Sequence, residues 1–241
     1  MTKYYRITHS LNNKILGNHD QVIKGVYPCS IYDPQFVDQI FFEKSTFHPL
    51  TAKAILNKGA KLTDLINSSI VGIGLKLFLS GKLKRIIEEN TDQGIEFFRT
   101  PILKNNVEYT DYFLLNAYVD RMDRVDFKNS EINLRIRKKE GGTEIVKIKT
   151  ETRDDFLATK EFHKNAVGLT FINKLKLQNV KEDFLLIGYM QGGPGYLVSE
   201  YLKRKIEENN CTGIEFMPSE FSFQEWFRTG GEREKIYGKA S

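Results

Sequence analysis

Hydrophobic positions recur at helical spacing in two segments that lie far apart in the chain. The apolar residues of each segment fall on one helical face: Leu79, Leu83, Ile86 and Ile87 in the first, and Val198, Tyr201, Leu202 and Ile206 in the second. Ser80 and Ser199 precede these segments and can accept a backbone N–H from the first helical turn. The pattern therefore predicts two helices with serine N-caps.

The residues after the two predicted helices also correspond. Asn90 and Asn209 stand where a residue in the left-handed conformation would end each helix, and a glycine follows within a few positions. The next three residues are Ile-Glu-Phe in both segments, at 95–97 and 214–216. Their apolar, polar, apolar alternation predicts a half-buried strand.

These correspondences indicate an internal repeat. Aligned without a gap, residues 80–98 and 199–217 are identical at twelve of nineteen positions. A match of that density predicts a duplicated helix–turn–strand unit.

The charges along both predicted helices run against the local electrostatic preference. Each helix places a base four residues before an acid, in the pairs Lys84–Glu88, Arg85–Glu89, Lys203–Glu207 and Arg204–Glu208. The helix dipole favours the reverse order by a few tenths of a kcal/mol per pair. Either both units inherited this order on a solvated face, which we favour, or the Lys-Arg pair is presented to a partner.

Strand patterns dominate the remainder of the second half. Residues 112–119 read as a buried strand, and residues 132–149 as a β-hairpin with one apolar and one basic face around Gly141-Gly142. Residues 184–190 predict a further strand, which leads through the glycine-rich turn at 191–195 into the second helix. The predicted fold class is α+β, with mixed or antiparallel sheets.

The repeat suggests a division into two halves. Residues 1–110 contain the first copy, and residues 111–241 contain the hairpin and the second copy, unless the halves form one continuous domain. The polar tail beyond Gly230 is expected to fray.

Composition narrows the class of protein. With 40% hydrophobic and 28% charged residues, the chain is typical of globular proteins, and its net charge of +5 includes no polybasic arm. The N-terminus lacks the apolar run of a signal peptide, and the most apolar stretch, residues 70–79, is about half a membrane span. Two cysteines make no disulfide framework. We expect a cytoplasmic protein without membrane contact.

No familiar catalytic motif stands out. The four histidines show no metal-binding spacing, and Cys29 and Cys211 lie outside known nucleophile contexts. The turn at 191–195 lacks the Gly-Lys-Ser/Thr ending of a phosphate loop, and Pro194 removes an N–H donor. We therefore predict no enzyme activity, no metal and no cofactor.

Two segments are candidate contact surfaces. The basic face of the hairpin could follow nucleic-acid phosphates, but it lacks interleaved aromatic residues and is interrupted by Glu140 and Glu144. A solvated edge that resists aggregation is the favoured interpretation, followed by an acidic partner surface. The aromatic cluster at 221–227 could be an interface, although covering the edge of a core is more common. The candidate partner contacts are Arg135, Arg137, Lys138, Lys139, Lys147, Trp226 and Phe227.

The repeat and the strand before the hairpin resemble a known family. The segment Val198–Lys203 with Thr212–Pro218, and the segment Tyr112–Asn116 followed by Asp120, Asp126 and Ser130, are similar to motifs of bacterial polymorphic-toxin immunity proteins, immunity family eleven. The resemblance spans residues 75–220 approximately.

This resemblance implies a cytosolic protein that binds and neutralises a cognate toxin by occlusion rather than catalysis. It implies no catalytic residues, and it does not specify the chemistry of the toxin. The alternative hypothesis is a nucleic-acid-associated module that uses the hairpin at 132–149. The sequence allows a homo-oligomer but does not indicate one.

Overall fold

The computed structural model describes residues 2–74, 76–92, 94–138, 140–164 and 168–240. Its helices are α1 (Asn13–Leu16), α2 (Gly81–Glu89), α3 (Arg153–Lys164), α4 (Glu200–Glu208), α5 (Phe223–Phe227) and α6 (Glu232–Tyr237), with 3-10 turns η1 (Val37–Gln39) and η2 (Met122–Arg124). Its strands are β1 (Tyr4–His9), β2 (Val22–Val26), β3 (Lys53–Leu56), β4 (Leu65–Ile66), β5 (Leu77–Ser80), β6 (Ile95–Arg99), β7 (Ile102–Lys104), β8 (Val107–Tyr109), β9 (Tyr112–Ala117), β10 (Glu131–Arg137), β11 (Thr143–Ile148), β12 (Leu169–Lys174), β13 (Phe184–Met190), β14 (Gly193–Ser199) and β15 (Ile214–Pro218).

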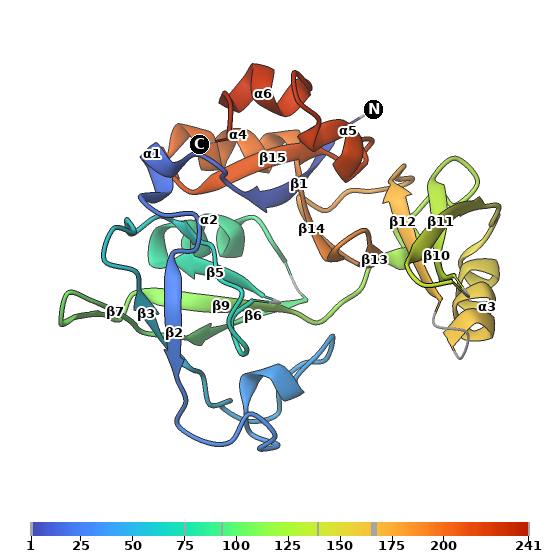
Figure 1. Cartoon of the computed structure of the whole chain (residues 1–241). Helices are drawn as coiled ribbons and strands as arrows, with labels where there is room; N and C mark the ends of the chain where they lie inside the picture. The colour runs from blue at the N-terminus through green and yellow to red at the C-terminus, as the bar shows by residue number, and fades with distance from the viewer. Residues whose placement is uncertain (1, 75, 93, 139, 165–167, 241) are drawn as a thin grey trace.

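Three sheets make up the α+β fold, which confirms the predicted class. The largest has the order β11-β10-β12-β13-β14-β1-β15, and the two four-stranded sheets have the orders β4-β5-β9-β6 and β2-β3-β7-β8. Pairing is mainly antiparallel, with parallel contacts between β12 and β13 and between β3 and β7. Strand β1, blue in Figure 1, is inserted between β14 and β15, so the beginning of the chain lies within its C-terminal half.

The sequence repeat is part of a larger structural repeat. We define copy one as β4, β5, α2, β6 and β9, and copy two as β13, β14, α4, β15 and β1. Within each copy the strands have one order and only antiparallel pairing, β4-β5-β9-β6 and β13-β14-β1-β15. Strand β1 therefore has the place in copy two that β9 has in copy one. In sequence, β9 follows the helix of its copy, whereas β1 comes before all the other elements of copy two.

The two copies agree residue by residue. Paired strand residues of copy one have their counterparts 119 residues later, the separation of Ser80 from Ser199, as in Leu65 with Leu79 and Phe184 with Val198. The registers obey this offset: Ser80 pairs with Tyr112 in copy one, and Ser199 pairs with Tyr4 in copy two. The hydroxyl groups of both tyrosines donate to equivalent carbonyl oxygens, Tyr112 to that of Thr63 and Tyr4 to that of Glu182.

Both predicted serine N-caps are confirmed. The Oγ of Ser80 accepts from the N–H of Leu83, and the Oγ of Ser199 accepts from the N–H of Leu202. Each serine hydroxyl also donates to the aspartate that directly precedes a strand, Asp64 before β4 or Asp183 before β13. These aspartates lie sixteen residues before their serines in both copies.

One hydrophobic core joins the copies. Equivalent residues from both line it, in the pairs Leu65/Phe184, Leu79/Val198, Leu83/Leu202, Ile87/Ile206 and Leu115/Ile7. Segments of both predicted halves thus bury their apolar surface against each other, which is the dominant favourable contribution to folding.

Several local predictions are corrected. Asn90 and Asn209 have φ of −115° and −83°, so they end their helices without the left-handed conformation, which Asn210 adopts instead. The glycine-rich turn does not lead into a helix: Gly192 and Gly193, at φ of 80° and 110°, connect β13 to β14. Positive φ at these positions suits a hairpin, and glycine adopts it without strain.

The C-terminal tail is not frayed as expected. Arg233 of α6 is buried, and its guanidinium group forms two hydrogen bonds of 2.7 Å with the carboxylate of Glu215. Glu215 is itself fully buried, so the Ile-Glu-Phe strand of copy two is not half exposed. A buried carboxylate needs a partner, and Arg233 is that partner. Their pairing therefore explains both why the tail is ordered and why Glu215 can be buried.

Candidate protein-binding surface

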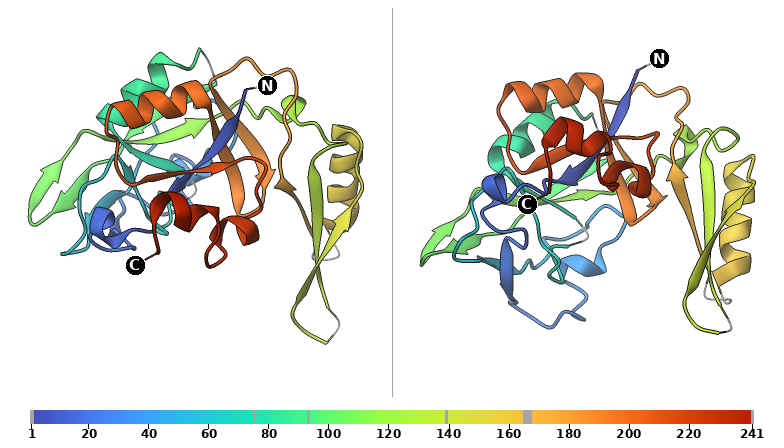
Figure 2. Two further views of the ribbon diagram at one scale, coloured as in Figure 1. Left: turned by 90° about the horizontal axis from the view of Figure 1, so that it is seen from above. Right: turned by 45° about the horizontal axis from the view of Figure 1, so that its top comes forward.

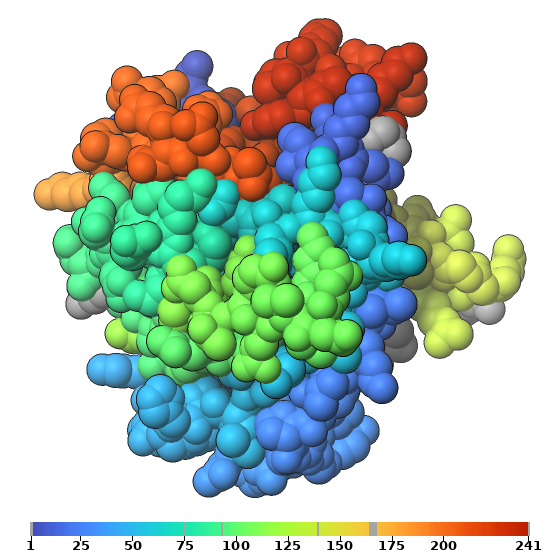
Figure 3. Space-filling view, turned by 90° about the vertical axis from the view of Figure 1, so that its left-hand side faces the viewer, coloured from blue at the N-terminus to red at the C-terminus, as the bar shows by residue number. Residues whose placement is uncertain are grey.

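The predicted hairpin forms one side of a small lobe. Strands β10 and β11 pair along their whole length, β12 pairs with β10, and α3 packs beside them. Figures 1 and 2 show this lobe standing to one side of the two repeat copies, and the views of Figure 2 show the hairpin extending away from them. In Figure 3 the same hairpin projects beyond the outline of the rest of the molecule.

The alternation within β10 divides the lobe into two faces. Ile132 is buried with Ile172 of β12 and Phe156 of α3, which places the apolar face against the helix. The opposite face carries Arg135 and Arg137, as the alternation predicted.

The outward face is less purely basic than predicted. Across the sheet, Arg135 lies opposite Ile145 of β11 and opposite Leu169 of β12. Both aliphatic side chains are about half exposed, at 50% and 51%. The guanidinium carbon of Arg135 lies 5.8 Å from the ring centroid of the buried Phe171. We call Arg135, Ile145 and Leu169 the hairpin row.

Such a row has the composition of a protein interface. Arginine is enriched among the residues that dominate binding energy, and the two half-exposed aliphatic side chains add apolar surface beside it. The signal for Ile145 was in the sequence, because it has the same strand parity as Lys147. The position of Leu169 could not be predicted from alternation, because β12 lies outside the hairpin and its pairing with β10 is not apparent in the sequence.

The charges around the row are partly neutralised. Lys147 lies across the sheet from Asn133, and its ammonium group lies 3.3 Å from the carboxylate of Glu131. Lys138, beside the turn, lies 3.9 Å from Glu144. The candidate residue Lys139 lies outside the described residues. The structure thus brings Arg135, Arg137 and Lys147 onto one face and places Lys138 at its end.

The aromatic candidates lie elsewhere. Trp226 of α5 is fully buried between Phe221 and Tyr237, so it offers no surface in this structure and covers the core instead. Phe227 is 41% exposed and contacts Phe223 edge to face. Helix α5 contacts β12 through an ion pair of Glu225 with Lys174, at the end of the strand away from Leu169. Trp226 and Phe227 therefore do not join the hairpin row.

The lysines of the repeat are engaged internally. Each ammonium lies within 5.5 Å of two ring centroids, those of Phe97 and Phe113 for Lys84 and those of Phe216 and Tyr5 for Lys203. Both lysines also pair with the glutamate four residues later. A cation over aromatic rings gains about 0.5–1 kcal/mol or more, which offsets the unfavourable charge order along the helix. Arg85 and Arg204 remain exposed.

Other polar groups serve the scaffold. Among the described residues, no group of three or more histidine, cysteine or carboxylate side chains could hold a metal ion. The buried Lys76 donates to the carbonyl of Ile40 and to the side chain of Asn116, and burial lowers its pKa to about 8. The buried Arg6 donates to the carbonyls of Gln191 and Pro194 and so holds the glycine-rich turn.

No helix in the described part of the chain has the length and apolarity needed to cross a bilayer. Comparison with protein-family models and with curated proteins found no match to this chain.

Proposed function

We propose that this chain is a cytosolic immunity protein that binds a toxin and blocks it by occlusion. The observation that carries the proposal is the hairpin row: an arginine between two half-exposed aliphatic residues on a projecting hairpin. The resemblance of the repeat to polymorphic-toxin immunity proteins supplies the class of partner.

The form of the lobe supports inhibition by contact. Stable protein interfaces bury about 1,600 Å² in total, of which a few central residues contribute most of the affinity. A projecting hairpin can enter a concave surface, and Arg135 can form a bidentate pair with a carboxylate there. The excess of positive charge on this face favours an acidic patch on the toxin.

The test uses the gene beside that of this protein. An immunity protein requires a toxin domain encoded there, and co-expression of the pair should restore growth that the toxin alone prevents. The purified proteins should also associate in a pull-down. Absence of association would overturn the assignment, even if growth were restored by an indirect effect.

One observation favours a second function. Because Arg135, Arg137 and Lys147 share a face, the hairpin could bind nucleic acid through phosphates. That function predicts retention on heparin with a steep salt dependence, reduced by Arg135→Ala and Arg137→Ala. The ion pairs of Lys138 and Lys147, and the aliphatic members of the row, favour the protein partner.

A further inference from the structure

The two repeat copies meet at two junctions, and the first is closed by hydrogen bonds. We define the first junction as the contact between the start of β4 and the residue before Gly213. The backbone N–H groups of Asp64 and Leu65 donate to the carbonyl of Thr212 at 3.0 and 3.1 Å. In return, the N–H of Thr212 donates to Oδ2 of Asp64 at 2.8 Å.

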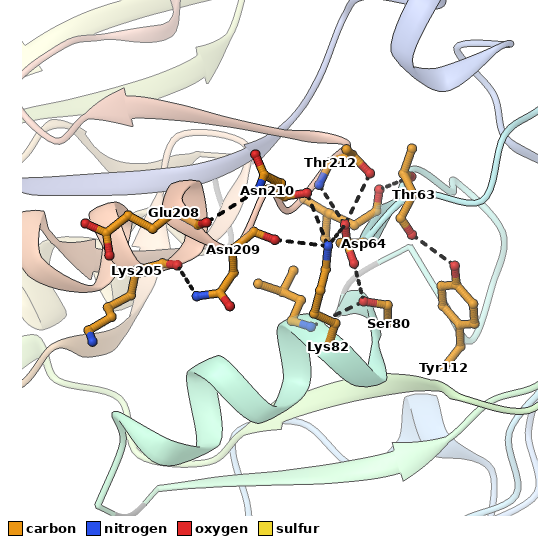
Figure 4. A network of polar contacts seen from close by, with 12 residues as sticks. Thr63, Asp64, Ser80, Lys82, Tyr112, Lys205, Glu208, Asn209, Asn210 and Thr212 are labelled. Atoms are coloured by element: carbon orange, nitrogen blue, oxygen red, sulfur yellow. Dashed lines mark hydrogen bonds and ion pairs between the residues drawn. The ribbon is translucent and has the colours of Figure 1, made fainter.

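A lysine ammonium completes this junction. The Nζ of Lys82 lies 3.1 Å from Oδ2 of Asp64 and donates to the carbonyls of Asn209 and Asn210 at 3.3 and 3.1 Å. Figure 4 shows the ammonium between the carboxylate and the C-terminal end of α4. Unpaired carbonyls at a helix C-terminus attract positive charge, so carboxylate and helix end form one cradle for a cation.

The repeat places counterparts of these residues at the second junction, where Thr91 lacks the positive φ of Asn210. By the offset of 119 residues, Asp183 corresponds to Asp64, and Asn90 and Thr91 at the end of α2 correspond to Asn209 and Asn210. Ser199 donates to Oδ1 of Asp183 as Ser80 donates to Oδ1 of Asp64, so Oδ2 of Asp183 corresponds to the atom that holds the Lys82 ammonium.

The residue that supplies the cation at the first junction is not kept at the second. Tyr201, 45% exposed, occupies the position of Lys82. A pocket of about 510 Å³ lies at this junction, and Asn90, Thr91, Asp183 and Tyr201 all line it. Asp183 and the residues at the end of α2 thus line one cavity, at the junction where tyrosine stands in place of the lysine.

We infer that this pocket binds an alkylammonium group, with the ammonium between Asp183 and the carbonyls of Asn90 and Thr91. The apolar stem would lie along Ile95, Phe184 and Leu186, which line the same pocket. The ring of Tyr201, which already lies 5.6 Å from the Lys205 ammonium, adds an aromatic wall that attracts cations.

The other charges of the pocket are compatible with a cation. Its arginines, Arg121 and Arg124, pair with Glu182 and Asp123. Lys181 is exposed, and Glu89 and Asp92 add negative charge near the cradle. The site lies at the Phe184 end of β13, whereas the hairpin lobe joins that strand at its Met190 end, so its test needs no toxin.

The ligand chemistry has two sources, a lysine side chain of another protein or a free polyamine. The full chain would be titrated with Nα-acetyl-lysine methylamide and with cadaverine while the backbone amide NMR signals of residues 90–92 and 183–186 are followed. We expect saturable shifts with a dissociation constant of about 1 mM or tighter for at least one amine. Nα-acetyl-norleucine methylamide, which lacks the charge, should bind at least tenfold more weakly. If Nα-acetyl-lysine methylamide binds more tightly, the ligand is a lysine side chain of another protein. If cadaverine binds more tightly, the ligand is a free polyamine.

Two variants make the assignment specific. Tyr201→Lys gives copy two the lysine of copy one, keeps Asp183, and should reduce amine binding at least tenfold. Tyr201→Met, the matched comparison, removes the ring without adding an ammonium and should weaken amine binding by about two- to fivefold, the contribution of one cation–aromatic contact, and so by less than Tyr201→Lys does. The inference is overturned if neither amine shifts these signals, if the norleucine derivative binds equally well, or if Tyr201→Lys binds as tightly as the wild type.

Discussion

Equivalent residues of the two copies have diverged in burial while keeping the same kind of contact. Glu96 and Glu215 both accept backbone N–H groups from the N-terminal half of the chain, those of Ser45 and Leu11 respectively. Only Glu215 is fully buried, and only Glu215 faces an arginine from the C-terminal tail. The same motif residue therefore connects a loop in copy one and anchors α6 in copy two.

Removing the partner of Glu215 should be strongly destabilising. Arg233→Met leaves a buried carboxylate without its counter-charge, which typically costs about 3–5 kcal/mol. Urea unfolding should show this loss, and the double variant Arg233→Met/Glu215→Gln should recover part of it. The matched change Glu96→Gln, at a partly exposed position, should cost about 1 kcal/mol. A loss below 1 kcal/mol for Arg233→Met would contradict the anchoring role.

A histidine at the end of β1 should make stability depend on pH. Burial lowers the pKa of His9 from 6.5 to about 4, opposed by a hydrogen bond with the backbone of Ile66. Above pH 6.5 both folded and unfolded states are neutral at this residue. As pH falls, the unfolded state takes up the proton first, so stability is lost between about pH 6.5 and 4, by about 3 kcal/mol in full.

The variant His9→Gln should remove most of the pH dependence between 6.5 and 4.5. Urea unfolding at several pH values would measure it, and the carboxylates contribute chiefly below that window. A wild-type protein that is equally stable at pH 6.5 and 4.5 would refute the assignment to His9.

At the scale of elements, the hairpin shows how alternation decides exposure. On its helix-facing side Ile132 is buried in one cluster with Phe156 of α3, whereas Val146 of β11 is 39% exposed, and its outward residues depend on neighbouring strands for their surroundings. Arg135 acquires Ile145 and Leu169 as neighbours only through the register of β11 and β12.

If the partner is the toxin that we propose, changing the hairpin row should weaken its binding without unfolding the protein. Arg135→Ala and Ile145→Ser should each lower the affinity at least tenfold, as expected for central interface residues. Arg204→Ala, at an exposed arginine of α4, is the control and should change affinity less than about twofold. Surface plasmon resonance would measure these affinities, and thermal unfolding should be nearly unchanged. If all three variants changed the affinity by the same factor, the hairpin row would not be the interface.

At the scale of the whole molecule, the repeat is completed by the first strand of the chain. Strand β1 is hydrogen bonded to β14 on one side and to β15 on the other, and Ile7 belongs to the shared core. Contacts between positions about 200 residues apart therefore decide whether copy two is complete. Loss of this strand would expose two unpaired edges and the apolar residues beneath them.

Deleting residues 2–9 should abolish cooperative unfolding of the protein. Circular dichroism during heating would follow this, with a chain lacking only residues 239–241 as the control, because Lys239 and Ala240 are exposed. The control should keep the melting temperature of the wild type within about 2 °C. A chain without β1 that melts at the wild-type temperature would show that copy two does not need its N-terminal strand.

The sequence by itself determined the helices α2 and α4, their serine caps, the strands after them and the hairpin at 132–149. These features depend on periodicity, capping and turn residues within about twenty positions, where the physical causes are contiguous. The α+β class followed from them. The face that Arg135 and Arg137 occupy was predictable as well, because alternation alone places them on the side of the strand opposite to Ile132 and Leu134.

Only the tertiary structure decided the features that depend on distant partners. The burial of Trp226, the pairing of Glu215 with Arg233 and the place of Leu169 beside Arg135 all require strands or helices brought together from far along the chain. The same holds for β1, whose sequence is identical to that of β9 only at Tyr4 and Tyr112, although the two strands have the same register in their copies. The sequence therefore specified the repeated helix–turn–strand unit. Long-range strand pairing, which leaves little local signal in the sequence, decided which strands complete the two copies.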